Sequence, residues 1–122
     1  MRSVVGLLAI GLVGLSSYPA WGAATIARNR RDTFYYATSP TLGEASSAVL
    51  DYCASSSGLN CQVVTTNNGR GWSAVAKSPQ GYGTAMGYES AATAKRVALD
   101  GCLAETPVGG TCAIVLTFFD PS

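Results

Sequence analysis

The sequence predicts an α+β fold, a two-layer sandwich in which two helices cover one face of a five-stranded, mainly antiparallel sheet. A repeated unit leads to this prediction. The segments "AVLDYC" (Ala48–Cys53) and "VALDGC" (Val97–Cys102) are helix-like and end at a cysteine, and each is followed by a second cysteine that begins a β-rich run. One copy alone could not bury its helix. Both helices are therefore expected to share one sheet, in the order β-α-β-β-β-α-β with an internal duplication.

The N-terminal segment has the features of a secretory signal peptide over residues 1–22. Arg2 precedes a 12-residue apolar run, Val4–Leu15, and small residues follow it. Cleavage is expected after Gly22 or after Ala24. The run is shorter than the roughly 20 apolar residues of a membrane-spanning helix, which leaves an uncleaved anchor as the alternative. The protein is expected to be exported, to the periplasm or the cell exterior, with no stable membrane span after processing.

Residues 23–32 are expected to form a flexible basic lead-in to a single disulfide-pinned α+β domain over 33–120. The lead-in contains one charge cluster, "RNRRD" (Arg28–Asp32), for which a tether to an anionic surface is the alternative. Without Arg2 the chain has seven Lys and Arg residues against seven Asp and Glu residues. A chain of this charge lacks the basic stripe of a nucleic-acid-binding protein, so no nucleic-acid partner is expected.

The first half of the domain is predicted to fold as strand, helix and strand. The aromatic run "TFYYAT" (33–38) is typical of a strand, and Thr41 with Glu44 makes a T-x-x-E capping box before a helix over 42–53. The run "CQVVTT" (61–66) predicts the next strand. The Asn-Gly pair that follows favours a tight hairpin turn.

The second half is predicted to contain one strand more than the first. The returning strand covers 72–77 and a further strand covers 84–89. Ser90 caps a second helix over 91–103, whose inward face is mostly alanine, and a strand at 112–119 ends the domain. When the two copies are aligned on their cysteines, "YYATSP" of the first copy corresponds to "AVAKSP" of the second. The additional strand then has no counterpart in the first copy.

The four cysteines of this exported chain are expected to form two disulfides. The pairing that respects the repeat is Cys53–Cys61 and Cys102–Cys112, each closing the corner between a helix and the next strand. A zinc site on the four thiolates is the alternative, but the C-x7-C and C-x9-C spacings lack the close C-x2-C pair of such sites. No metal and no other cofactor is expected.

Three stretches resemble a secreted bacterial family, domain-of-unknown-function family 4189. They are "WSAVAKSP" (Trp72–Pro79), "GYESAATAKRVALDGC" (Gly87–Cys102) and "CAIVLTFF" (Cys112–Phe119). The run "CQVVTTNNGRGWSAVA" is also similar to the family, although Gly71-Trp72 stands where a cysteine is common. This departure suggests one disulfide fewer than in fuller members of the family, or a different disulfide pattern. The resemblance implies a fold and a cell-envelope or extracellular setting, and it implies no reaction.

Few residues are candidates for catalysis, and no enzymatic activity is expected. The chain contains no histidine, which excludes the Ser-His-Asp and Cys-His arrangements. Asp51 and Asp100 occupy matching positions in the two copies, and as an acid–base pair they could act on a cell-wall or other glycan. The simpler interpretation is that each is a solvated residue near a helix end. The glycine-rich "GYGTAMGY" (81–88) fits tight turns and close helix packing better than phosphate binding.

Aromatic residues are numerous for a domain with so little charge. Neighbouring residues of a strand face opposite sides of a sheet, so some aromatic side chains are expected on the face without helices. Unless loops or the N-terminal arm cover them, they mark a partner surface. The expected function is non-catalytic binding of another envelope or secreted protein, as an inhibitor, an immunity-type protein or an envelope interaction module. The alternative is a self-associating structural or accessory envelope protein. The candidate partner surface comprises Tyr35, Tyr36, Trp72, Tyr88, Phe118 and Phe119.

Overall fold

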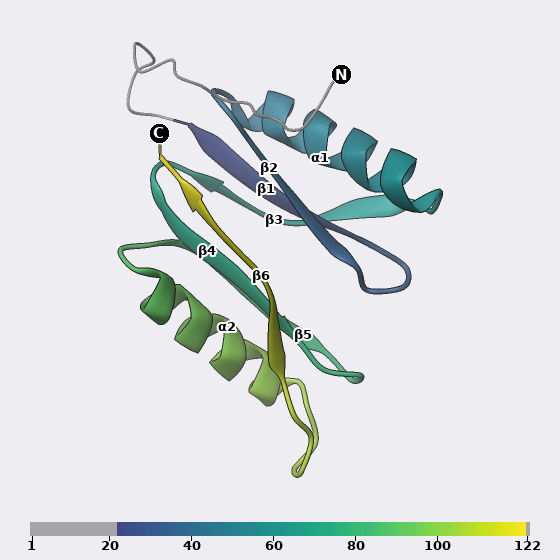
Figure 1. Cartoon of the computed structure of the whole chain (residues 1–122), viewed down its shortest axis with the longest axis vertical. Coiled ribbons are helices and arrows are strands. Elements are labelled where there is room, and N and C mark those ends of the chain that lie inside the picture. The colour runs from purple at the N-terminus through teal and green to yellow at the C-terminus, as the bar shows by residue number, and fades with distance from the viewer. Residues whose placement is uncertain (1–21, 122) are drawn as a thin grey trace. The chain divides into compact units, whose positions relative to one another are not determined.

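The computed structural model describes residues 22–121 and has an α+β fold with two helices and six strands in this range (Figure 1). The predicted signal peptide, apart from Gly22, lies outside the described residues. Every segment predicted as a helix or strand forms that element, with ends shifted by a few residues. The elements are β1 (Ala23–Asn29), β2 (Phe34–Ser39), α1 (Leu42–Ser57), β3 (Cys61–Asn68), β4 (Gly71–Lys77), β5 (Tyr82–Tyr88), α2 (Ala91–Ala104) and β6 (Ala113–Asp120).

The strands form two three-stranded antiparallel sheets, so the prediction of one five-stranded sheet is wrong. The strand order is β2-β1-β3 in the first sheet and β5-β4-β6 in the second. The physical reason lies in the central strands. β1 pairs with both β2 and β3, and β4 pairs with both β5 and β6, so each central strand uses both of its hydrogen-bonding edges within its own sheet.

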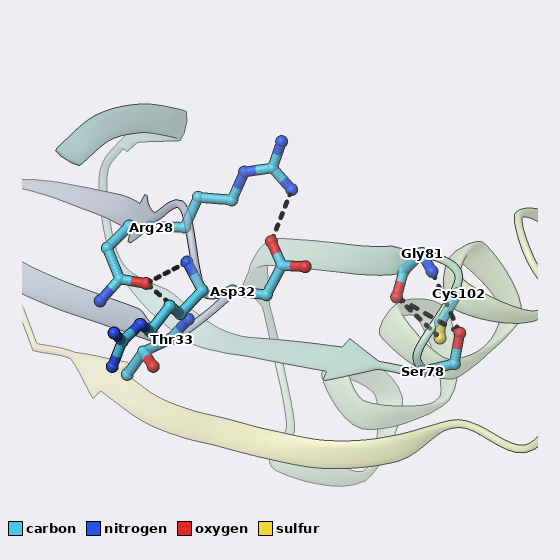
Figure 2. A network of polar contacts seen from close by, with 8 residues as sticks. Arg28, Asp32, Thr33, Ser78, Gly81 and Cys102 are labelled. Carbon is cyan, nitrogen blue, oxygen red and sulfur yellow. Dashed lines mark hydrogen bonds and ion pairs between the residues drawn. The ribbon is translucent and has the colours of Figure 1, made fainter. Parts of the chain in front are cut away.

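The strand that the sequence analysis missed is β1, and the prediction of a flexible lead-in over 23–32 is wrong for this part. β1 is the centre of the first sheet, and every residue from Ala23 to Ala27 is buried. The basic residues that suggested a solvated segment lie at its end and in the turn to β2. Arg28 is half-buried and forms an ion pair with Asp32 at 3.2 Å (Figure 2).

The described chain divides into two compact units after Arg70, where a single domain over 33–120 was expected. Unit 1 contains β1, β2, α1 and β3. Unit 2 begins at Gly71 and contains β4, β5, α2 and β6. In Figure 1 each helix lies against the sheet of its own unit.

In unit 1, small side chains allow α1 to pack closely on the central strand. The Thr41 side chain caps the helix by accepting a hydrogen bond from the backbone N–H of Glu44, as predicted. Ala45, Val49 and Cys53 are the fully buried residues of α1. The Thr25 hydroxyl of β1 lies 3.3 Å from the Ser46 hydroxyl of the helix, which places Thr25 on the helix-facing side of the sheet.

In unit 2 the buried cluster beneath α2 consists of small residues. Ser90 caps α2 by accepting from the backbone N–H of Thr93, as predicted. Gly83 of β5 lies so close to α2 that an added Cβ would collide with the backbone at Ala98 O and Cys102 N. This strand therefore requires a glycine at the point where the helix crosses it. The buried cluster comprises Ala74, Ala76, Ala85, Ala94, Ala98 and Cys102.

The two units are copies of one β-β-α-β motif, and both have their first strand at the centre of the sheet. The matching sequences are "TIARN" (Thr25–Asn29) and "AVAKS" (Ala74–Ser78), so the predicted match of "YYATSP" to "AVAKSP" is wrong. The register of β1 against β3 shifts between Ile26 and Ala27. The register of β4 against β6 shifts at the matching place, between Val75 and Ala76. A shared bulge position is strong support for a duplication, because bulges are specific features of a fold.

A buried polar side chain closes the first turn of each copy. The Asn29 side chain accepts hydrogen bonds from the backbone N–H groups of Arg31 (2.8 Å) and Thr33 (3.1 Å). At the matching position, the Ser78 hydroxyl accepts from the N–H groups of Gln80 and Gly81, both at 3.1 Å (Figure 2). Side chains of this kind stabilise turns by pairing with the backbone two or three residues further on.

Two disulfides join the cysteine pairs that the repeat predicts. Cys53 bonds to Cys61 and Cys102 bonds to Cys112, and both pairs have Cα atoms 6.2 Å apart. Each bridge connects the last turns of a helix to the start of the next strand, at the first residue of β3 and at the residue before β6, and each lies within one unit. The two disulfides indicate folding in an oxidising compartment. Within residues 22–121, neither helix has the length and hydrophobicity that crossing a membrane would require.

Candidate functional site: an aromatic row on the second sheet

Three of the predicted surface residues lie side by side on the sheet of unit 2. Trp72 of the central strand is the register partner of Tyr88 on β5 and of Phe119 on β6. Directly opposed residues of antiparallel strands point to the same face, so the three aromatic side chains form a row across all three strands. We call Tyr88, Trp72 and Phe119 the aromatic row.

The row lies on the face of the sheet that carries α2, so the prediction that the exposed aromatic side chains lie on the face without helices is wrong for these three residues. Trp72 and Tyr88 both pack against the buried alanine cluster beneath that helix. The rings of Trp72 and Phe119 have centroids 5.2 Å apart and planes tilted by 46°. Trp72 and Tyr88 are half-buried and Phe119 is 37% exposed, so one side of the row is supported by the core while the rest contacts solvent.

Two glycines position the row. Gly71 precedes Trp72 and Gly87 precedes Tyr88, and both have positive φ angles, 146° and 79°. A Cβ added to Gly71 would lie 2.6 Å from the backbone carbonyl carbon of Gly87, so the two strands approach too closely here for any side chain. The register of β4 against β5 also shifts just after Trp72. This local irregularity turns the Trp72 and Tyr88 side chains onto the same face.

The matching positions of unit 1 carry no aromatic residues. Ala23 is the counterpart of Trp72, and its register partners are Ser39 on β2 and Asn68 on β3. Because both units share topology, bulge position and turn chemistry, the motif itself folds without an aromatic row. The row is therefore a property of one copy alone.

The remaining predicted surface residues are separated from the row. Tyr35 of unit 1 faces α1 and makes an edge-on contact with Tyr52, with ring centroids 5.5 Å apart. Tyr36 follows it on the opposite face and is 41% exposed. Phe118 pairs with Ser73 on the face of the second sheet that lies opposite α2, and it is buried.

Tyr52 is an aromatic residue that the sequence analysis left out of the candidate surface. It is half exposed on α1, where its ring lies beside that of Tyr35. The counterparts of Tyr35 and Tyr52 in unit 2 are Gly83 and Gly101, which approach each other closely. The Tyr35 and Tyr52 rings of unit 1 therefore lie at the position where, in unit 2, α2 packs closely against β5.

The carboxylates considered for catalysis lie exposed on the two helices. Asp51 is on α1 and Asp100 is at the matching position of α2. The backbone carbonyl of Asp51 accepts a hydrogen bond from the Ser55 hydroxyl at 2.6 Å, an interaction internal to the helix. Among residues 22–121, no group of three or more His, Cys, Asp or Glu side chains is placed to hold a metal ion.

No family model, curated protein or solved structure matches the chain. The resemblance to domain-of-unknown-function family 4189 therefore stays a prediction based on the motifs quoted above.

Proposed function

We propose that the protein is an exported, non-catalytic binding protein and that the aromatic row contacts its partner, another envelope or secreted protein. One observation carries the proposal. Unit 2 has tyrosine, tryptophan and phenylalanine on three adjacent strands where unit 1 has serine, alanine and asparagine. Since the motif folds without these aromatic side chains, their retention in one copy is best explained by a contact outside the fold.

The geometry of the row suits a protein partner. Aromatic residues that are supported by a core on one side and open on the other are typical of the residues that dominate binding energy at protein interfaces. The Trp72 and Phe119 planes are tilted by 46°, so the two rings do not form one flat platform for stacked sugar rings.

The setting that supports this function is the periplasm or the cell exterior. Two disulfides fit an oxidising compartment, and the predicted signal peptide and the family resemblance favour the same location. A small disulfide-bonded protein with little net charge in that compartment fits an inhibitor, an immunity-type protein or an envelope interaction module.

The proposal is tested by affinity capture with matched variants. The oxidised mature protein is immobilised and exposed to the envelope and secreted fractions of its own host, and bound proteins are identified by mass spectrometry. Phe119→Gln removes an exposed ring from the row. Val115→Gln is the control, because Val115 lies on the same strand and is 46% exposed.

We expect one stoichiometric partner that the wild type and Val115→Gln retain and that Phe119→Gln loses. Recovery of no protein other than the chain itself, with a molecular mass that rises with concentration, would contradict the proposal. That result would favour a self-associating structural role.

A further inference from the structure

We propose that the turn between β1 and β2 binds the phosphate groups of anionic lipid headgroups through Arg30 and Arg31. This site is in unit 1 and is independent of the aromatic row. The backbone of the turn is fixed by hydrogen bonds that leave both arginine side chains uncommitted. Asn29 N–H donates to Thr33 O at 3.1 Å, Asp32 N–H donates to Asn29 O at 3.0 Å, and the Asn29 side chain accepts from the backbone of residues 31 and 33.

The turn between β1 and β2 carries a net charge of +2, from three arginines and one aspartate over residues 28–32. Its one carboxylate, Asp32, is paired with Arg28 at 3.2 Å, as Figure 2 shows. Arg30 and Arg31 are exposed, and their side chains form no hydrogen bond or ion pair with residues 22–121. Acidic and basic residues balance after the signal peptide is removed, so this tip concentrates positive charge on a protein whose total charge is near zero.

The second copy shows that the fold does not need these arginines. Ser78 closes the corresponding turn as Asn29 does, and the residues that follow it are Pro79 and Gln80, both uncharged. Both turns are closed by a buried polar side chain at the same position, but only the turn of unit 1 carries charged residues at its exposed tip. The fold of the turn therefore does not require the two arginines, which leaves their side chains available to a ligand.

The chemistry of the tip points to phosphate on a membrane surface. A guanidinium group offers a planar pair of N–H donors that matches two oxygens of one phosphate. Two adjacent arginines on a short fixed turn can each reach a separate mobile headgroup. A nucleic acid would instead require a longer basic stripe that follows its backbone. Each basic residue near an anionic bilayer strengthens binding by a factor of about five.

The test is cosedimentation of the mature protein with vesicles of phosphatidylcholine, with and without phosphatidylglycerol. We expect binding that requires phosphatidylglycerol and weakens as salt rises. Arg30→Ala with Arg31→Ala should lower the affinity by about twentyfold, and Arg30→Lys with Arg31→Lys should retain part of it. The matched control is Lys95→Ala with Arg96→Ala, which removes an adjacent exposed basic pair from α2 and should leave binding unchanged.

Equal losses in the tip variant and the α2 control would overturn the proposal, because binding would then follow net charge alone. Binding to pure phosphatidylcholine, or vesicle binding that low concentrations of inorganic phosphate abolish, would exclude the membrane as the source of the phosphate. Tighter binding to RNA or to polyglutamate than to the anionic vesicles would also overturn it. The Phe119→Gln variant should bind vesicles like the wild type, so this test is separate from that of the proposed function.

Discussion

At the scale of single residues, the molecule depends on a few side chains that complete backbone hydrogen bonding. Ser78 accepts from two backbone N–H groups and its hydroxyl lies 2.8 Å from the Thr106 hydroxyl, which itself donates to Cys102 O at 2.8 Å. Thr106 also lies 3.5 Å from the sulfur of Cys112. One buried serine thus connects the β4–β5 turn to the end of α2 beside the disulfide, as Figure 2 shows for Ser78, Gly81 and Cys102.

Replacing Ser78 by alanine should destabilise the protein by about 1–3 kcal/mol, because the N–H groups of Gln80 and Gly81 lose their acceptor in a partly buried place and the Thr106 hydroxyl loses one partner while it keeps its bond to Cys102 O. Urea denaturation measures the change. Gln80→Ala, in the same turn but exposed, is the control and should change the unfolding free energy by less than about 0.5 kcal/mol. Similar effects of the two substitutions would show that the turn does not depend on Ser78.

Gly83 is the second residue on which the structure depends. Gly83→Ala should destabilise the protein by about 3 kcal/mol or more, because the new methyl group would overlap the backbone of α2 and force the helix away from β5. Gly43→Ala is the matched control. Gly43 is in the first turn of α1 with open space around it, so alanine there should leave stability unchanged or raise it by up to about 1 kcal/mol. Thermal unfolding of both variants measures the change in stability. An unchanged stability of Gly83→Ala would contradict the close packing of β5 against α2.

At the scale of elements, the helices were predictable from the sequence and the first strand was not. Thr41 and Ser90 are recognisable caps, and the cysteines mark where each helix ends and a strand follows. The residues of β1, "AATIARN", begin with small residues that resemble the end of a signal peptide and finish with arginine and asparagine. Local composition therefore indicated a processed or solvated segment. Only pairing on both edges, with β2 directly after it and with β3 beyond α1, makes it a buried central strand.

The position of β1 yields a prediction about processing. Signal cleavage should occur after Gly22 and not after Ala24, because Ala23 and Ala24 are buried and pair with both neighbouring strands. Intact mass measurement of the exported protein should give a chain that begins at Ala23. A chain that begins at Thr25 would contradict the prediction, since the central strand would then lose its first two residues on both edges.

At the scale of the whole molecule, the duplication is the most informative feature. The helix–cysteine–strand repeat was visible in the sequence, but the shared turn and bulge were hidden because Asn29 and Ser78 fill the same role with different side chains. The candidate site was predictable only in part. Alternation along the strands separated Phe118 from Phe119, whereas the grouping of Trp72, Tyr88 and Phe119 depends on strand register across β4, β5 and β6.

A duplicated motif provides its own comparison, since a feature that the fold requires is expected in both copies. Turn closure, bulge position, helix capping and the disulfide occur in both units. The aromatic row occurs only in unit 2, and the pair of arginines occurs only in the turn of unit 1. These differences separate what the motif needs in order to fold from the features that we propose for binding.

The affinity of the captured partner for Phe119→Gln, relative to Val115→Gln, tests the proposed function most directly. Calorimetric titration of the oxidised mature protein should show the wild type and Val115→Gln binding alike. Phe119→Gln should bind at least about tenfold more weakly, because loss of one of the few residues that dominate an interface costs about 2 kcal/mol or more, and 1.4 kcal/mol is a factor of about ten. Equal affinities of Phe119→Gln and the wild type, with both proteins folded and oxidised, would show that the aromatic row is not the partner surface.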